Sequence, residues 1–233
     1  MMYLKSLLVA AFVFIACNVF AQSASTIRLF GGIGGGERNE KGLIIPTNPK
    51  LEVSALCALT TGYEIGKFRI SAGFSFASTS KKETKTGLLW ESDFQFDTIG
   101  QATSTGTTYT HYAVFRYAGV PVSVGYIVPI SEKIRVILEI GAIPAITLPI
   151  MYTYINESTK EKRTSTHKAG NTYNVFSLSG LGLVTIEFDI APYASLNAGG
   201  YYTYQFTNMV SSQPKGNLHE QTYGGTIGVT FKL

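Results

Sequence analysis

The sequence predicts an all-β protein, an eight-stranded antiparallel up-and-down transmembrane β-barrel with short periplasmic turns and long extracellular loops. The first observation is compositional: charged residues make up 15% of the 233 residues, against about 25% in soluble domains, while Tyr and Phe number 14 each. The second is a repeated alternation of apolar and polar residues with a period of two. The third is a strict alternation of short and long polar connections between the alternating segments.

The chain opens with a segment typical of secretory signal peptides. Lys5 supplies a positive charge, an unbroken apolar run follows at 7–16, and small residues up to Ala21 provide a cleavage site. The run is too short for a membrane-spanning helix, which needs about 20 apolar residues. We therefore expect residues 1–21 to be a cleaved signal peptide and residues 22–233 to form the barrel domain.

The two cysteines fit an exported chain without disulfide bonds. Lipidation of Cys17 is the alternative to cleavage after Ala21. Cleavage would leave Cys57 alone, which excludes a disulfide framework and a cysteine metal site. We expect Cys57 to serve as a small buried hydrophobic residue.

Eight segments of the expected mature chain alternate between apolar and polar residues. In one of them Phe68, Ile70 and Phe74 are apolar, and Arg69 and Ser71 lie between them. Such alternation indicates strands with one apolar and one polar face. The expected strands are 27–34, 51–65, 68–76, 120–126, 134–147, 176–188, 194–205 and 226–233.

The connections between these strands differ in length in a regular order, long first. The short connections are 64–67, 129–133 and 189–192, and the long ones are around 35–50, 79–108, 153–171 and 207–220. In an outer-membrane barrel one rim carries short turns and the other carries long surface loops, whereas a soluble sandwich has no reason to follow that order. Periodicity alone leaves open a soluble exported sandwich or a lipocalin-like barrel, in which the same apolar faces would point inward.

The polar face of the strands would line a lumen that side chains can fill. Charged residues on this face should pair across neighbouring strands, because a buried charge without a partner is costly. We expect Arg135 and Glu139 to reach Arg69 or Glu187 across a closed and narrow barrel. The expected lumenal charge network comprises Arg28, Arg69, Arg135, Glu139, Glu187 and Lys232, with Glu64 beside it.

The sequence of one expected strand and its flanking residues resembles a signature of a known protein family. The segment 117–126, which reads YAGVPVSVGY, is similar to the YLEIPLLLKY signature strand of PorT-like outer-membrane β-barrel proteins of the Bacteroidota. The stretch 134–148 and the segment 205–209, QFTNM, resemble later strands of that family. The sequence departs from the family pattern at Gly119 and Gly125, where an inward acid and an inward lysine are usual. The resemblance implies an eight-stranded outer-membrane barrel and, for most members, no defined activity; the founding members act in a secretion pathway.

Motifs for chemistry are scarce in this sequence. The glycine-rich run at 31–36 fails the spacing of a nucleotide-binding loop and is expected to belong to the first strand. His111, His167 and His219 all fall at the surface-loop end, but none has an Asp at a fixed short spacing. The net charge of +4, without any block of basic residues, gives no footprint for nucleic acid. We therefore expect no enzyme activity, no cofactor and no metal site.

We expect the protein to lie in the outer membrane, in contact with its lipid, and to act as a structural or surface-interaction protein through its extracellular loops. The loop 79–108 is the candidate for an extracellular or envelope partner, because Trp90, Phe94 and Phe96 alternate there with polar residues. The alternative is that this aromatic face only caps the barrel mouth. A small-solute channel or a secretion-associated component is the alternative function, and an outer-membrane enzyme is less favoured.

Overall fold

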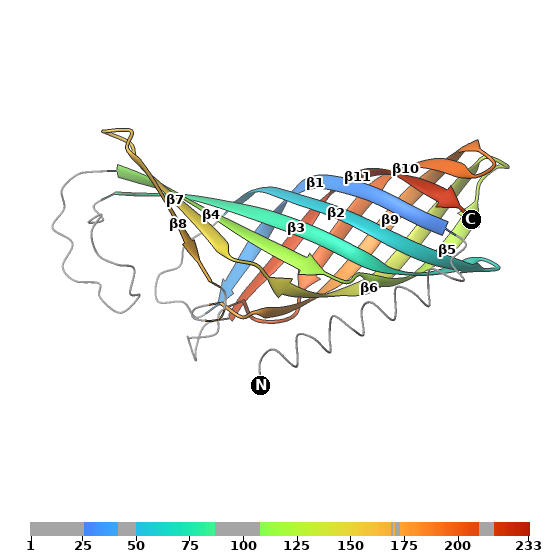
Figure 1. The fold of residues 1–233 in the computed structure, drawn as a ribbon, viewed down its shortest axis with the longest axis horizontal. Helices are drawn as coiled ribbons and strands as arrows, with labels where there is room; N and C mark the ends of the chain where they lie inside the picture. Colours follow the sequence, from blue (N-terminus) through green and yellow to red (C-terminus); the bar gives the residue numbers. More distant parts are fainter. Residues whose placement is uncertain (1–25, 42–49, 87–107, 169, 171–172, 210–216) are drawn as a thin grey trace.

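The computed structural model describes residues 26–41, 50–86, 108–168, 170, 173–209 and 217–233. Figure 1 shows a closed barrel of tilted strands, from one end of which a few strands extend further. No helix among the described residues is long and apolar enough to cross a membrane.

Eleven strands make up this part of the chain, and each pairs antiparallel with its neighbours. They are β1 (Thr26–Lys41), β2 (Lys50–Ile65), β3 (Phe68–Thr86), β4 (Thr108–Gly119), β5 (Val122–Pro129), β6 (Ile134–Thr147), β7 (Ile150–Asn156), β8 (Lys162–His167), β9 (Phe176–Ala191), β10 (Ala194–Gln205) and β11 (Asn217–Lys232). The barrel closes where β1 pairs with β11, from Thr26 opposite Lys232 onward.

These strands form the eight continuous walls of one barrel, some of them built from two consecutive strands, and we call each wall a stave. This confirms the predicted fold class. Two of the three additional strand breaks have a local cause at proline, which has no N–H for the hydrogen-bond ladder, and the third lies between β8 and β9. Pro121 separates β4 from β5, yet both strands pair with β3 and β6. Pro149 separates β6 from β7 in the same way, and β4 pairs with both.

The strands extend further into the long connections than the alternation predicted. β1 runs to Lys41 and β3 to Thr86, so these strands continue well past the expected ends. The connection 153–171 was expected to be a polar loop, but it is mostly a hairpin of β7 and β8. Together with the distal parts of β3 and β4, this hairpin forms a four-stranded sheet beyond the barrel, which we call the extension.

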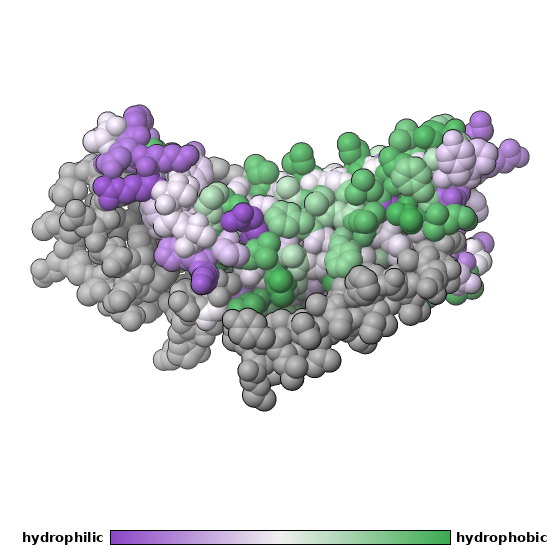
Figure 2. Space-filling model, viewed as in Figure 1, coloured by the Kyte–Doolittle hydropathy of each residue, from purple (hydrophilic) through white to green (hydrophobic). Residues whose placement is uncertain are grey.

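The outside of the barrel is apolar. Ile33, Ile140 and Ile227 are 73%, 75% and 75% exposed, and the other large exposed hydrophobic residues also alternate along the strands. Figure 2 shows these side chains as a hydrophobic surface over the barrel, with hydrophilic residues at the extension and at the opposite tip. Cys57 belongs to this outer surface and is exposed, so its expected burial is wrong. A soluble barrel with its apolar faces inward is therefore excluded, and the apolar belt fits the acyl chains of a bilayer.

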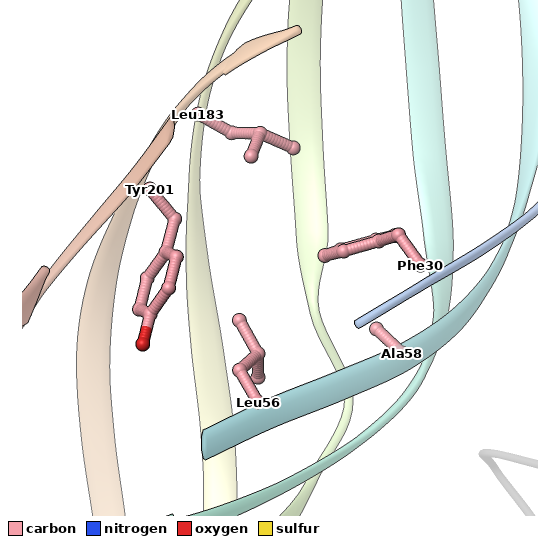
Figure 3. Packing of buried hydrophobic residues seen from close by; sticks show 5 residues of the cluster. All are labelled: Phe30, Leu56, Ala58, Leu183 and Tyr201. Atoms are coloured by element: carbon pink, nitrogen blue, oxygen red, sulfur yellow. The ribbon is translucent and has the colours of Figure 1, made fainter. Parts of the chain in front are cut away.

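The inside of the barrel is filled by side chains from opposite staves. Figure 3 shows one layer of this filling, in which Phe30, Leu56 and Ala58 face Leu183 and Tyr201 across the lumen. A second apolar cluster lies where the extension meets the barrel and comprises Ala113, Phe115, Ile150 and Met209. Polar residues such as Thr230 and Ser195, both 0% exposed, occupy the remaining inward positions.

Candidate functional site: the lumen and the extension

The end of the lumen near the short turns contains a compact ion-pair cluster. Glu187 on β9 accepts hydrogen bonds from Arg69 Nη1 at 2.8 Å, from Arg135 Nε at 2.7 Å and from Thr230 Oγ1 at 2.9 Å. Glu64 accepts from the other sides of the same arginines, at 3.0 Å from Arg69 Nε and at 3.2 Å from Arg135 Nη1. Arg69 is 1% exposed and Glu187 is 0% exposed, so both charges are neutralised within the protein. We call these four charged residues the Glu187 cluster.

A second ion pair crosses the barrel from β1 to β6. Arg28 Nη2 donates to Glu139 Oε1 at 3.0 Å, and Ser123 Oγ donates to the same oxygen at 3.2 Å. The Arg28 guanidinium also lies over the ring of Phe30, 5.0 Å from its centroid. Arg28 therefore connects the charged layer to the apolar layer of Figure 3.

The structure brings together most of the predicted charged residues, but in a different arrangement. Arg135 reaches Glu187, as expected, whereas Glu139 pairs with Arg28. Lys232 joins neither cluster and pairs with Asp189 at 2.6 Å near the short-turn rim. The sequence reading missed Asp189, because it placed that residue in the turn between two strands. Asp189 belongs to β9, two residues beyond Glu187 on the same inward face, and its carboxylate also accepts a hydrogen bond from Ser195.

Small inward residues make space for these long side chains. A Cβ on Gly125 would lie 2.7 Å from Cγ of Glu139, and a Cβ on Gly119 would lie 2.8 Å from Cγ2 of Ile143. The space at Gly119 and Gly125 is therefore filled by side chains from the neighbouring stave.

Two hollows lie on opposite sides of this filling. A cavity of about 60 Å³ lies on the extension side of the apolar layer and is lined mainly by hydroxyl-bearing residues and Glu220. Such a volume holds a few water molecules. A wider hollow of about 330 Å³ opens at the short-turn rim beside Lys67, Lys133 and Arg135. The Glu187 cluster and the apolar layer separate the two spaces.

The three histidines do not form a common site. His111 stacks on Tyr152 and Tyr154, with ring centroids 5.3 and 4.7 Å apart, and His167 meets the edge of Tyr152 at 5.1 Å. His219 lies elsewhere, stacked on Tyr204, with its Nδ1 3.0 Å from the carbonyl oxygen of Gln205. Among the described residues no group of three potential metal ligands comes together. Trp90, Phe94 and Phe96 lie outside the described residues, so their surface role stays a prediction.

Comparisons with known proteins find similarity in structure alone. No family model matches the chain, and no curated protein sequence matches it. One similar solved structure is that of Ail, the attachment invasion locus protein of Yersinia pestis, in complex with the heparin analogue sucrose octasulfate. It is 13% identical over 87% of this chain and 97% of its own, with a TM-score of 0.37. Neisserial surface protein A is 14% identical over 90% of this chain and 98% of its own, with a TM-score of 0.38. The outer membrane protease OmpT of Escherichia coli is 10% identical over 91% and 98%, with a TM-score of 0.45.

The location of the protein follows from its own surface. A closed barrel leaves no sheet edge unpaired, and its exterior carries an apolar belt with polar groups confined to the lumen and the two ends. In barrels of this type the short turns face the periplasm and the long loops face outward, so the extension lies on the extracellular side. The chain is a transmembrane β-barrel of the outer membrane.

Proposed function

We propose that the protein is a non-conducting barrel that holds its extracellular end at the cell surface. It acts through that end as a structural or surface-interaction protein. The observation that carries this proposal is the blocked lumen. Two ion-pair layers and an apolar layer follow one another inside the barrel, and the cavity beyond them is about 60 Å³. Such a lumen offers no path to a solute, which favours this role over a small-solute channel.

The extracellular end carries the features that a partner could recognise. β3, β4, β7 and β8 project from the barrel as a paired sheet, and the described residues of the predicted connection 79–108 belong to β3 and β4 of this sheet. The resemblance to PorT-like barrels adds no activity to this role, because most members of that family have no defined activity. We assign no secretion role to this chain on that resemblance.

Conductance in a planar bilayer tests the closed lumen. The purified protein should show no stable open state, whereas a porin inserted in the same bilayer should show discrete steps. The double variant Arg28→Ala, Glu139→Ala removes one ion-pair layer but leaves the Glu187 cluster and the apolar layer in place, so it should show no stable open state either. Regular steps of wild-type current at neutral pH would contradict the proposal.

Surface cross-linking on intact cells tests the interaction role. Replacing 84–106 by a short Gly-Ser turn should leave the barrel inserted and protease-resistant but remove a cross-linked partner. The triple variant Trp90→Ala, Phe94→Ala, Phe96→Ala should do the same if those aromatic residues make the contact. If the shortened protein fails to fold, the loop has a structural role and the proposed contact is wrong.

A further inference from the structure

The outward face of the extension differs from the belt below it. Alternation continues along β3 and β4, so the residues beyond Phe76 on the lipid-facing side are Ser78, Ser80 and Lys82. Their register partners on β4 are Arg116, Val114 and Tyr112. The acyl-facing surface therefore passes directly into a face of hydroxyl groups and cations.

The same face continues across β7 and β8. Tyr112 pairs with Thr153 and Thr153 with Thr164, whose hydroxyl groups are 3.3 Å apart, while Ile155 pairs with Lys162. We call the residues of these four strands the outward face: Ser78, Ser80, Lys82, Tyr112, Val114, Arg116, Met151, Thr153, Ile155, Lys162, Thr164 and Thr166.

The outward face carries positive charge. Lys82 and Lys162 are exposed, and Lys82 Nζ lies over the ring of Tyr112, 5.7 Å from its centroid. Arg116 donates through Nη2 to the carbonyl oxygen of Pro149 at 3.1 Å, a neutral partner. Neither Lys162 nor Arg116 has an ion pair with a described acid. Lys82 lies close enough to Glu157 for its charge to lower the pKa of that carboxyl, so Arg116 and Lys162 are the two cations of this face left for an external anion, with Lys82 shared.

A described acid beside this face is already engaged. Glu157, in the turn between β7 and β8, pairs with Lys160 at 2.9 Å. The hydrogen bond from Lys160 is the main cause that lowers the pKa of the Glu157 carboxyl, and hydrogen bonding by Thr110 and the charge of Lys82 add to it. Glu161 likewise pairs with Arg163 at 3.1 Å, so the turn contributes no uncompensated negative charge.

The height of the cations above the belt indicates what they meet. Ala118 pairs with Phe76 and Ile146 at the edge of the belt. Arg116 lies two residues from Ala118 along β4, in the direction of the extension. Lys82 lies six residues beyond Phe76, which is about 20 Å along a strand at roughly 3.3 Å per residue. Cations at these positions lie at the level of lipid headgroups and of sugars attached to them.

We propose that the outward face binds the phosphorylated headgroup of a glycolipid in the surrounding outer leaflet. Arg116 and Lys82 contact phosphate or carboxylate groups, and the row of Ser and Thr hydroxyls contacts the sugars. Continuity with the belt favours a lipid of the same membrane over a soluble polyanion, because the acyl chains of that lipid already cover the adjoining surface. This inference goes beyond the proposed function and does not depend on a closed lumen.

Native mass spectrometry in a neutral detergent tests this binding. The probes are purified lipopolysaccharide, the same lipopolysaccharide after phosphatase treatment, and its delipidated phosphorylated oligosaccharide. Wild-type protein should prefer the intact phosphorylated form, and the preference should decrease with salt. The triple variant Lys82→Gln, Arg116→Gln, Lys162→Gln should reduce it by roughly fivefold for each charge removed.

Two further variants keep the outcome interpretable. Lys67→Gln, Lys133→Gln removes two exposed cations at the periplasmic rim and should leave the preference unchanged. Lys82→Gln, Lys162→Gln retains Arg116, whose contact with Pro149 could matter for folding, and should still lower the preference. Equal binding of the phosphorylated and dephosphorylated forms, or an equal loss in the rim variant, would overturn the proposal. Equally tight binding of the delipidated oligosaccharide would overturn it too, by assigning the face to a soluble polyanion.

Discussion

Substitution of Glu187 tests whether the ion-pair cluster holds the barrel together. The carboxylate is 0% exposed and accepts hydrogen bonds from Arg69, Arg135 and Thr230. In Glu187→Ala the guanidinium of Arg69, which is 1% exposed, would keep Glu64 as its remaining acid. Arg135 pairs with the same carboxylate, so one acid would face two arginines. Breaking a buried pair from one side typically costs about 3–5 kcal/mol, because one charge stays buried without compensation. We expect a loss of this size in the free energy of unfolding.

Removing the opposite charge as well should recover part of that loss. In the double variant Arg69→Ala, Glu187→Ala, the remaining pair of Arg135 and Glu64 is neutral, with Nη1 and Oε2 3.2 Å apart. The double variant should therefore be less destabilised than the sum of the two single variants, by about 1–3 kcal/mol as is usual within one network.

Urea unfolding of the refolded barrel in micelles, followed by far-ultraviolet circular dichroism, measures these energies. Glu132→Ala is the matched control, because Glu132 is exposed at the periplasmic rim and should change stability by less than about 0.5 kcal/mol. If Glu187→Ala cost no more than this control, or if the two single losses simply added, the cluster would not stabilise the barrel as argued.

Three other predictions concern the belt, the backbone and the orientation. Val229→Arg, on the lipid side of β11, should destabilise by about 2–4 kcal/mol near the bilayer midplane in the same unfolding assay. Gly73→Ala should destabilise markedly, because its Cβ would lie 2.1 Å from a backbone oxygen, whereas Gly35→Ala meets nothing within 4 Å and should be nearly neutral. Protease added to intact cells should cut only in the long connections, and cleavage between Ser131 and Glu132 would reverse the assigned orientation.

The sequence predicted the barrel well because lipid imposes a simple rule on its strands. Every second residue on a membrane stave must be apolar, and Leu59, Val124 and Leu196 are all about half exposed on the outer surface where the alternation placed them. The alternation did not predict strands beyond the membrane, where lipid no longer constrains the composition of a strand or the period of its apolar residues. β8 has the sequence KRTSTH, which carries no apolar face because both of its sides are solvated.

The pairing of lumenal charges was predictable only in part. The inward positions of Arg28, Arg69 and Glu139 follow from the alternation, but the partner of each depends on which staves face each other across the lumen. That relation is set by strand tilt and register, which a list of strands does not contain. Asp189 was missed for a different reason: it continues the inward alternation of β9 two residues beyond Glu187, but the predicted strand ended at Phe188.

The arrangement of the strands separates stability from surface recognition. β3 is a single strand of 19 residues that begins beside the Glu187 cluster and ends in the extension. Its register with β4 continues without a shift from Ser75 to Thr86, so the described strands provide no hinge between the lumen and the outward face. Changes to the Glu187 cluster should therefore alter the free energy of unfolding and leave the preference for phosphorylated glycolipid intact. Changes at Lys82 or Lys162 should do the opposite, because those side chains contact neither ion-pair layer. A variant of one region that altered both properties would show that the barrel transmits strain along β3.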